Sequence, residues 1–161
     1  MLYHLFICRH AEAPALHHPQ QDFDRPLSNT GHLEAMQAGD WLRQHQYTPD
    51  IIWCSSAQRT LSTARIIADI LVYNQNNIQA MEQIYNASAA SLLAVITRLS
   101  PTKSSALVVG HNPGVSHLIE LLSGRDVGYV PPGSVHRLWF EMANWLELYA
   151  ALSLGYETNC K

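Results

Sequence analysis

The sequence is poor in basic charge, in cysteine and in long apolar stretches. It has ten Lys and Arg against thirteen Asp and Glu in 161 residues, a net charge of −3, which does not indicate a nucleic-acid-binding surface. Its three cysteines, an odd number, fit reduced thiols better than a disulfide framework. No apolar stretch approaches the length of a membrane span, and the beginning of the chain lacks the features of a signal peptide. These absences predict a cytoplasmic protein that binds neither nucleic acid nor a membrane.

Apolar runs alternate with helical patterns along most of the chain. The short apolar runs predict strands at residues 3–8, 51–54, 78–81 and 106–109. Helices are expected at residues 28–46, 55–71 and 88–99, and in a segment that ends near residue 122. Residues 135–140 and 145–154 are expected to pair as antiparallel strands around Asn144. This alternation predicts an α/β fold, a three-layer α/β/α sandwich with a mostly parallel central sheet, and we expect one domain over residues 1–161.

The strongest chemical signal is a basic pair at the end of the first predicted strand. Arg9 and His10 directly follow the apolar run that ends at Cys8, and both side chains are costly to desolvate. The carboxyl ends of parallel strands are where open α/β sheets bind ligands. An arginine there can hold an oxyanion with two hydrogen bonds, and a histidine can attack phosphorus or carry a proton. The pair therefore predicts a phosphate or carboxylate site with a nucleophilic imidazole.

Three further basic residues occupy comparable places. Arg59 lies at the start of the helix that follows the second strand, where free N–H groups and the helix dipole favour anions. His111 follows the strand at residues 106–109, and Arg25 lies in the loop before the first long helix. Because parallel strand ends face the same way, we expect these groups to converge on one pocket.

Together these motifs resemble the histidine phosphatase superfamily, which is named for an Arg-His-Gly motif and includes the phosphoglycerate mutases. Arg9-His10-Ala11 matches that motif with Ala in third place. Ser55-Ser56-Ala57-Gln58-Arg59 is similar to its Ser-Pro-x-x-Arg segment, and Val109-Gly110-His111-Asn112 to its second histidine motif. The short length and the Arg25-Pro26-Leu27-Ser28 segment are most similar to SixA-type phosphohistidine phosphatases. The resemblance covers nearly the whole chain.

The resemblance implies a phosphoglycerate mutase-like domain in which His10 becomes phosphorylated. It implies that Arg9, Arg25, Arg59 and His111 bind the phosphoryl oxygens, with no metal and no other cofactor. The substrate implied is a phosphorylated histidine-containing phosphotransfer protein. Elementary electrostatics agrees, because nearby positive charges should disfavour protonated His10 and keep a lone pair available for attack. A backbone carbonyl that accepts from the other ring nitrogen would fix the tautomer.

One departure from the family pattern concerns the leaving group. Members that cleave phosphate esters carry a carboxylic acid after the third strand, which protonates the leaving oxygen. Asn86 aligns near that position, and Glu82 lies close by. Because an imidazole departs more readily than an alkoxide, a missing acid favours an N–P bond over an ester. A loop that brought Glu82 into the site would instead indicate a broad phosphomonoesterase.

Two other classes of protein are alternatives. A non-catalytic phosphohistidine-binding module would keep the pocket without turnover, although binding alone does not require His10. A cysteine-dependent phosphatase would use Cys54 with Arg59, but the spacing is one residue shorter than the Cys-x5-Arg motif. The His17-His18 pair lacks a third ligand at a useful spacing, so we expect a solvated pair rather than a metal site.

Overall fold

A single twisted sheet forms the centre of the structure. Within residues 1–15 and 19–160, the part of the chain that this computed structural model describes, six strands pair in the order β3-β2-β4-β1-β5-β6. Their bounds are Leu2–Arg9 for β1, Ile51–Ser55 for β2, Gln79–Met81 for β3, Ser105–Gly110 for β4, Val135–Glu141 for β5 and Gly155–Thr158 for β6. Strands β1 to β4 run parallel, whereas β5 and β6 pair antiparallel with their neighbours. The pair His17-His18 lies outside the described residues.

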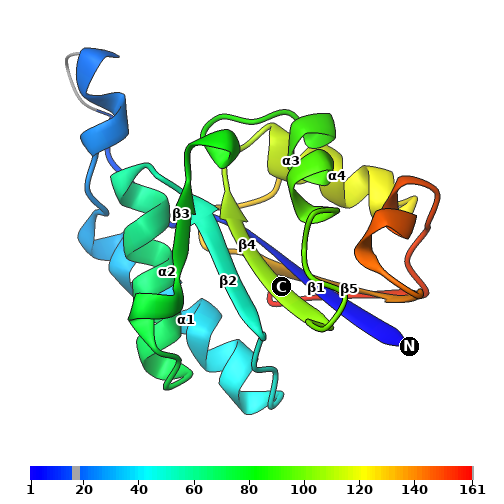
Figure 1. Ribbon diagram of the computed structural model, residues 1–161. Helices are drawn as coiled ribbons and strands as arrows, with labels where there is room; N and C mark the ends of the chain where they lie inside the picture. Colours follow the sequence, from blue (N-terminus) through cyan, green and yellow to red (C-terminus); the bar gives the residue numbers. More distant parts are fainter. Residues whose placement is uncertain (16–18, 161) are drawn as a thin grey trace.

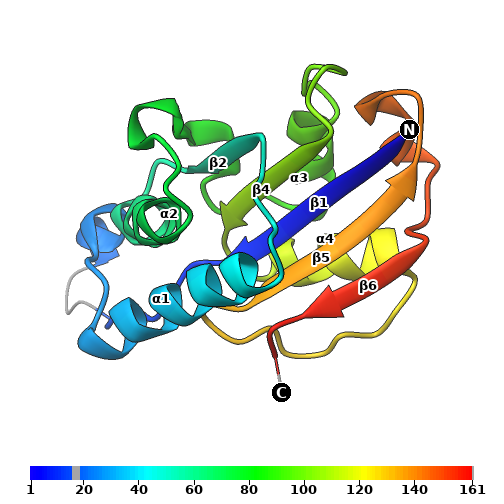
Figure 2. The same ribbon diagram turned by 90° about the horizontal axis from the view of Figure 1, so that it is seen from below.

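Helices cover both faces of this sheet (Figures 1 and 2). Helices α1 (Asn29–Gln44) and α2 (Gln58–Ile70) pack on one face, and α3 (Ala89–Ile96) and α4 (Gly114–Ser123) on the other. Four short 3-10 helices connect these elements: η1 (Pro19–Asp24), η2 (Gln75–Asn77), η3 (Glu82–Ile84) and η4 (Trp145–Tyr149). The predicted three-layer α/β/α arrangement with a mostly parallel sheet is confirmed. Among the described helices, none combines the length and the apolar character needed to cross a membrane.

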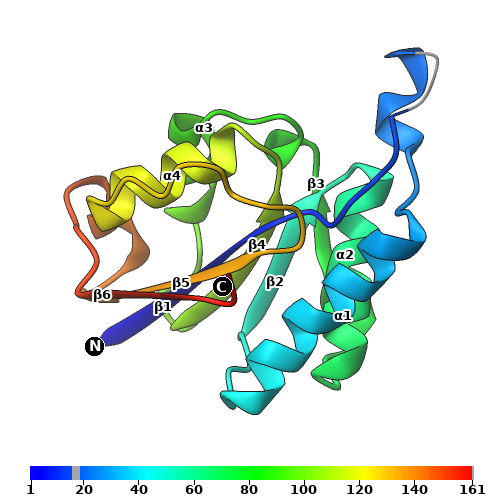
Figure 3. The same cartoon turned by 180° about the vertical axis from the view of Figure 1, so that it is seen from behind.

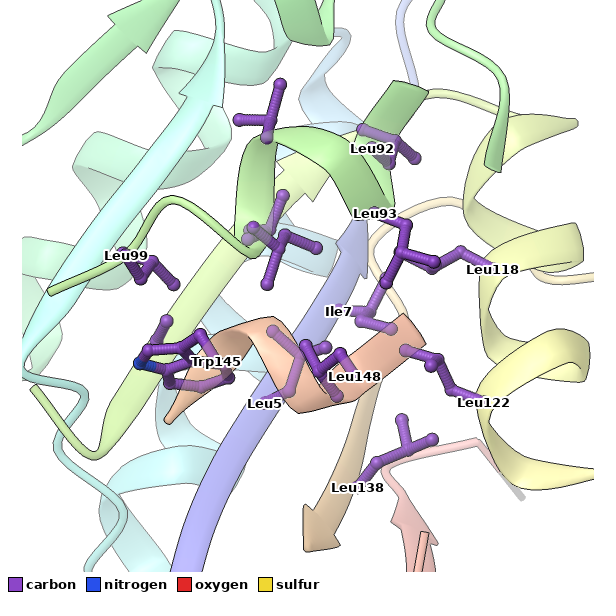
Figure 4. Close-up of a cluster of buried hydrophobic side chains, with 14 of the residues drawn as sticks. Leu5, Ile7, Leu92, Leu93, Leu99, Leu118, Leu122, Leu138, Trp145 and Leu148 are labelled. Carbon is purple, nitrogen blue, oxygen red and sulfur yellow. The ribbon is translucent and has the colours of Figure 1, made fainter. Parts of the chain in front are cut away.

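The central strand β1 contributes to the core on both of its faces. Leu5 and Ile7 point towards α3 and α4, where they pack with leucines of both helices and with Trp145 (Figure 4). Phe6 and Cys8 belong to the cluster beneath α1 and α2. A strand buried on both faces is apolar at successive positions, which explains the uninterrupted run in the sequence. The basic pair therefore lies at the end of a strand that is buried on both faces.

The expected strand at residues 145–154 is wrong. Trp145–Tyr149 forms η4, in which Trp145 and Leu148 are buried three residues apart, the period of a 3-10 helix. The Asn144 side chain accepts a hydrogen bond from the Leu146 N–H and so begins this turn. The antiparallel partner of β5 is instead β6, with Leu138 opposite Tyr156.

The connection from β2 to α2 also differs in detail from the expected serine cap. Ala57, and neither Ser55 nor Ser56, occupies the position before the first turn of α2. The Ser55 hydroxyl oxygen accepts a hydrogen bond from the Ala57 N–H at 3.1 Å. This short connection places Arg59 in the first turn of α2, at the carboxyl end of the sheet.

Candidate active site

A pocket of about 470 Å³ opens at the carboxyl ends of the parallel strands. The segment after β1 leads to η1, which lies at the same end of the molecule as the beginnings of α1 and α2 (Figure 3). The residues that line the pocket are Arg9, His10, Glu12, Ala13, Asp22, Arg25, Arg59, Asn86, His111, Asn112 and Pro132. The structure therefore brings together all five basic residues that were selected from the sequence.

His10 is held by its backbone and by one ring nitrogen. Its N–H donates to the Gly110 carbonyl at 3.0 Å, and its Nδ1 lies 2.7 Å from the Ala11 carbonyl. A carbonyl only accepts, so Nδ1 carries the proton and Nε2 is the unprotonated nitrogen, whose lone pair points towards Arg59. Burial lowers the pKa of His10 to about 4, the Ala11 hydrogen bond opposes this, and the charges of Arg59 and Arg9 add to the lowering. His10 is consequently neutral near pH 7, the state that the predicted nucleophile needs.

Arg59 connects the two histidines of the pocket. Its Nε donates towards His10 Nε2 at 3.3 Å, and its Nη2 donates towards His111 Nδ1 at 3.2 Å. On its other side, Nη1 donates to the Asp22 carbonyl at 2.7 Å, and Nη2 contacts the Asp22 carboxylate at 3.2 Å. The side chain is only 3% exposed. Because a buried arginine keeps its charge, a phosphoryl group in front of His10 would meet a fixed cation.

His111 follows β4 and is almost wholly buried. Burial lowers the pKa of His111 to about 3, and the charges of Arg59 and His10 lower it further. Because the Arg59 guanidinium has only donors, His111 Nδ1 must accept from it. The proton of the neutral ring then lies on Nε2, which is 2.8 Å from the Ser55 hydroxyl oxygen. Tyr85 packs its ring edge-on against the His111 ring, with 5.4 Å between the centroids.

Arg9 and Arg25 lie nearer the rim of the pocket. Arg9 Nη1 donates to the Val130 carbonyl at 2.8 Å and to the Tyr129 hydroxyl at 3.1 Å. Arg25 Nη1 donates to the Ala13 carbonyl at 3.0 Å. Both arginines are tied to loops rather than to the histidines, so they are placed to hold outer oxygens of a bound anion.

Asp22 is a site residue that the sequence interpretation missed. Its carboxylate accepts from Tyr85 at 2.6 Å, from Arg25 Nε at 3.0 Å and from Arg59. The Tyr85 hydrogen bond lowers the pKa of Asp22, burial opposes this, and the charges of Arg59 and Arg25 add to the lowering. An ionised Asp22 thus ties η1 to α2 and to the loop after η3. The sequence signal for Asp22 is its position three residues before Arg25, a spacing that places an acidic and a basic side chain one helical turn apart.

The position after the third strand presents an amide to the pocket. Asn86 lines the pocket, whereas Glu82 is exposed in η3 and lies outside the lining residues. Among the described residues, the carboxylates that line the pocket are Glu12 and Asp22. Glu12 accepts from the Ser28 hydroxyl through Oε1 at 2.8 Å. The loop movement that would bring Glu82 into the site is not seen in this structure.

The cysteine-dependent alternative does not fit the structure. Cys54 is fully buried in the cluster beneath α1 and α2, away from the pocket lining. Burial raises the pKa of its thiol to about 12. The nucleophilic form of cysteine is the thiolate, so this residue is inert near pH 7. Within residues 1–15 and 19–160, no group of three or more His, Cys, Asp or Glu is arranged to hold a metal ion.

Known proteins match the chain in sequence. The profile of the histidine phosphatase superfamily (branch 1) matches residues 5–84. The uncharacterized protein Rv1276c of Mycobacterium tuberculosis is 34% identical over 110 residues, 65% of each chain. The uncharacterized chloroplastic protein At3g52155 of Arabidopsis thaliana is 28% identical over 131 residues, 76% of this chain and 60% of its own. The chain thus spans less than two thirds of the length of these curated relatives.

Solved structures match it over a longer range. A protein assigned as the phosphohistidine phosphatase SixA of Nakamurella multipartitia has 25% identity and a TM-score of 0.79, over 99% of this chain and 95% of its own. The protein histidine phosphatase SixA complexed with tungstate has 23% identity and a TM-score of 0.70, over 84% of this chain and 86% of its own. The profile match includes the Arg9-His10 pair and Arg59, and the fold is shared across the chain. The chain thus matches the histidine phosphatase superfamily in sequence over residues 5–84, and it shares its fold with SixA over 99% of its length.

Proposed function

We propose that the protein is a phosphohistidine phosphatase, which removes the phosphoryl group from a histidine of a phosphotransfer protein in the cytoplasm. The observation that carries the proposal is the unprotonated Nε2 of His10, in a pocket lined by three arginines. The match to the histidine phosphatase superfamily and structural neighbours named as phosphatases support a hydrolase that acts on phosphate.

In the first step His10 Nε2 attacks the phosphorus. The new N–P bond forms as the bond to the substrate imidazole breaks, and its electron pair leaves with the substrate nitrogen. Positive charge that develops on the His10 ring is stabilised by the Nδ1–H bond to the Ala11 carbonyl. Arg59 and Arg9 hold the phosphoryl oxygens, since phosphoryl transfer depends mainly on positioning and charge stabilisation.

In the second step water attacks the phosphorus of phosphorylated His10. The His10–phosphorus bond breaks, its electron pair returns to Nε2, and inorganic phosphate is released. The same arginines serve both steps, because the charge on the phosphoryl oxygens is similar in each. Side-chain donors supply the stabilisation, so the proposed reaction is independent of metal ions.

The amide of Asn86 favours an N–P substrate over an ester. An imidazole leaves as a neutral ring when its other nitrogen carries a proton, whereas an alkoxide needs a proton from the enzyme. Asp22 is a poor source of that proton, because three donors hold it ionised. A broad phosphomonoesterase is the second candidate, since Glu12 lines the pocket and could supply the proton.

The decisive experiment compares kcat/KM for a phosphohistidine peptide with that for an alkyl phosphate. We expect a strong preference for phosphohistidine, with release of inorganic phosphate, and no large change in Glu82→Gln or Glu12→Gln. Asn86→Asp should raise ester hydrolysis, because it places a carboxyl group on the leaving-group side. Equal rates on both substrates, together with a collapse in Glu12→Gln, would establish the phosphomonoesterase instead. Binding of the peptide without phosphate release would establish a binding module.

A further inference from the structure

A fully buried hydroxyl group lies behind the second histidine of the pocket. Ser55, the last residue of β2, is 0% exposed, and its Oγ is 2.8 Å from His111 Nε2. The same oxygen accepts from the Ala57 N–H at 3.1 Å. This second contact fixes one lone pair of the oxygen and limits how the hydroxyl can turn. The Ser55 hydroxyl is therefore a defined partner of His111 and does not itself line the pocket.

The hydrogen bonds around His111 assign the proton of its neutral ring. Arg59 Nη2 donates to His111 Nδ1, so the neutral ring carries its proton on Nε2 and donates to Ser55. In this state Nδ1, the nitrogen that faces Arg59, has no proton to offer. A phosphoryl oxygen next to Nδ1 would face a lone pair, which repels it.

Binding of a phosphoryl group changes the hydrogen-bonding role of His111 Nδ1 from acceptor to donor. An oxygen that accepts from Arg59 Nη2 replaces His111 as the acceptor of that donor. Nδ1 then stabilises the oxygen only if it carries a proton itself. A neutral ring can do so when Nε2 gives up its proton and accepts from the Ser55 hydroxyl, whose oxygen still accepts from Ala57.

We infer that Ser55 is a positioning residue, whose hydroxyl turns from acceptor to donor towards His111 Nε2 when a phosphoryl oxygen binds at Nδ1. The inference rests on the proposed function, because it concerns how the same pocket holds the phosphoryl group. One proton is taken from water at Nδ1 and one is returned to water from Nε2, so the charge of His111 does not change. Ser55 thereby selects which nitrogen of the His111 ring carries the proton when a phosphoryl group is bound.

The kinetic test removes the Ser55 hydroxyl and uses a variant of the neighbouring Ser56 as the control. Ser55→Ala should lower kcat/KM for a phosphohistidine peptide by roughly 10- to 100-fold, less than the loss of a complete donor to the phosphoryl group. Ser55→Thr keeps the hydroxyl and should recover most of the activity. Ser56→Ala is the matched control, because the Ser56 hydroxyl has no hydrogen-bond partner among the described residues. Thermal unfolding of each variant shows whether it is folded.

The spectroscopic test follows the His111 ring by nitrogen-15 NMR in the wild-type protein, first without an anion and then with inorganic phosphate or tungstate. We expect the proton on Nε2 in the free protein and on Nδ1 in the complex, without a charged ring, between about pH 6 and pH 8. Protonation of both nitrogens in the complex would overturn the inference, as would unchanged protonation or a fully active Ser55→Ala. The NMR result does not depend on the substrate, whereas failure of the wild type to hydrolyse phosphohistidine would overturn the proposed function alone.

Discussion

Substitution of Arg59 tests whether one guanidinium organises both histidines of the pocket. Arg59→Met removes the charge and all four hydrogen bonds to His10, His111 and Asp22. Arg59→Lys keeps a positive charge but loses the planar fork that reaches both rings. The two variants therefore separate the effect of charge from the effect of geometry.

The magnitude follows from the number of donors that Arg59 offers. Loss of one preorganised donor to a developing negative charge costs about 10²- to 10³-fold in rate. Arg59 directs two nitrogens, Nε and Nη2, to the histidine side of the pocket. With both donors lost, we expect Arg59→Met to lose about 10⁴- to 10⁶-fold in kcat/KM, or about 5 to 8 kcal/mol. Arg59→Lys should lose about 10²- to 10³-fold, because one point charge remains.

The pH dependence should separate the variants further. The Arg59 charge contributes to the lowered pKa of His10 and of His111, so its removal raises both values towards the ordinary histidine range. Protonated His10 has no lone pair for attack, and the acid limb of kcat/KM therefore moves to higher pH in Arg59→Met. In Arg59→Lys the limb should move much less.

The assay is phosphate release from a phosphohistidine peptide between about pH 5.5 and pH 8, with an NMR titration of His10 in each variant. An Arg59→Met protein within about tenfold of the wild type would refute the central position of Arg59. An unchanged pKa of His10 would refute the electrostatic part of the reasoning.

Four further outcomes are expected. His10→Ala should abolish turnover without unfolding the protein, and acid-labile, base-stable phosphate should be trapped on His10 in the wild type; an active His10→Ala enzyme contradicts the mechanism. Arg25→Ala should cost less activity than loss of Arg59, about tenfold, because Arg25 lies on a rim loop; a larger loss than in Arg59→Met contradicts this ranking. A chelator should leave kcat unchanged, and strong inhibition would show that a metal takes part. Burial lowers the pKa of His136 to about 4, so the unfolded chain takes up a proton that the folded chain refuses, and stability should fall as the pH drops from about 6.5. Between about pH 7 and pH 5, the free energy of unfolding in urea should fall by roughly 2 kcal/mol less in His136→Gln than in the wild type. An equal fall in both proteins would exclude His136 as the cause.

The placement of the basic residues could be predicted because it depends on short stretches of chain. Arg9, His10 and His111 each follow a run of buried strand residues, and parallel strands end on the same side of a sheet. Arg59 needed only one further inference, that a helix begins directly after β2. In each case the neighbouring sequence determines where the side chain lies.

The contacts among these residues could not be predicted in the same way. Asp22 is 37 residues from Arg59 in the chain, and Ser55 is 56 residues from His111. Their roles depend on how η1, β2 and the loop after β4 pack together, which no local pattern describes. The error at residues 145–154 has a different cause, since the apolar residues of this segment are typical of a strand, whereas the three-residue spacing of Trp145 and Leu148 is that of a 3-10 helix.

The position of β1 has a consequence for hydrogen exchange. β1 is paired on both sides, with β4 and β5, and the His10 amide donates to Gly110 while the carbonyls of Arg9 and His10 accept from Gly133. Such an amide is released only when the whole sheet opens, so it belongs with the slowest-exchanging hydrogens of the protein. The proposed nucleophile thus lines a pocket with its side chain, while we expect its backbone amide to exchange only on global unfolding.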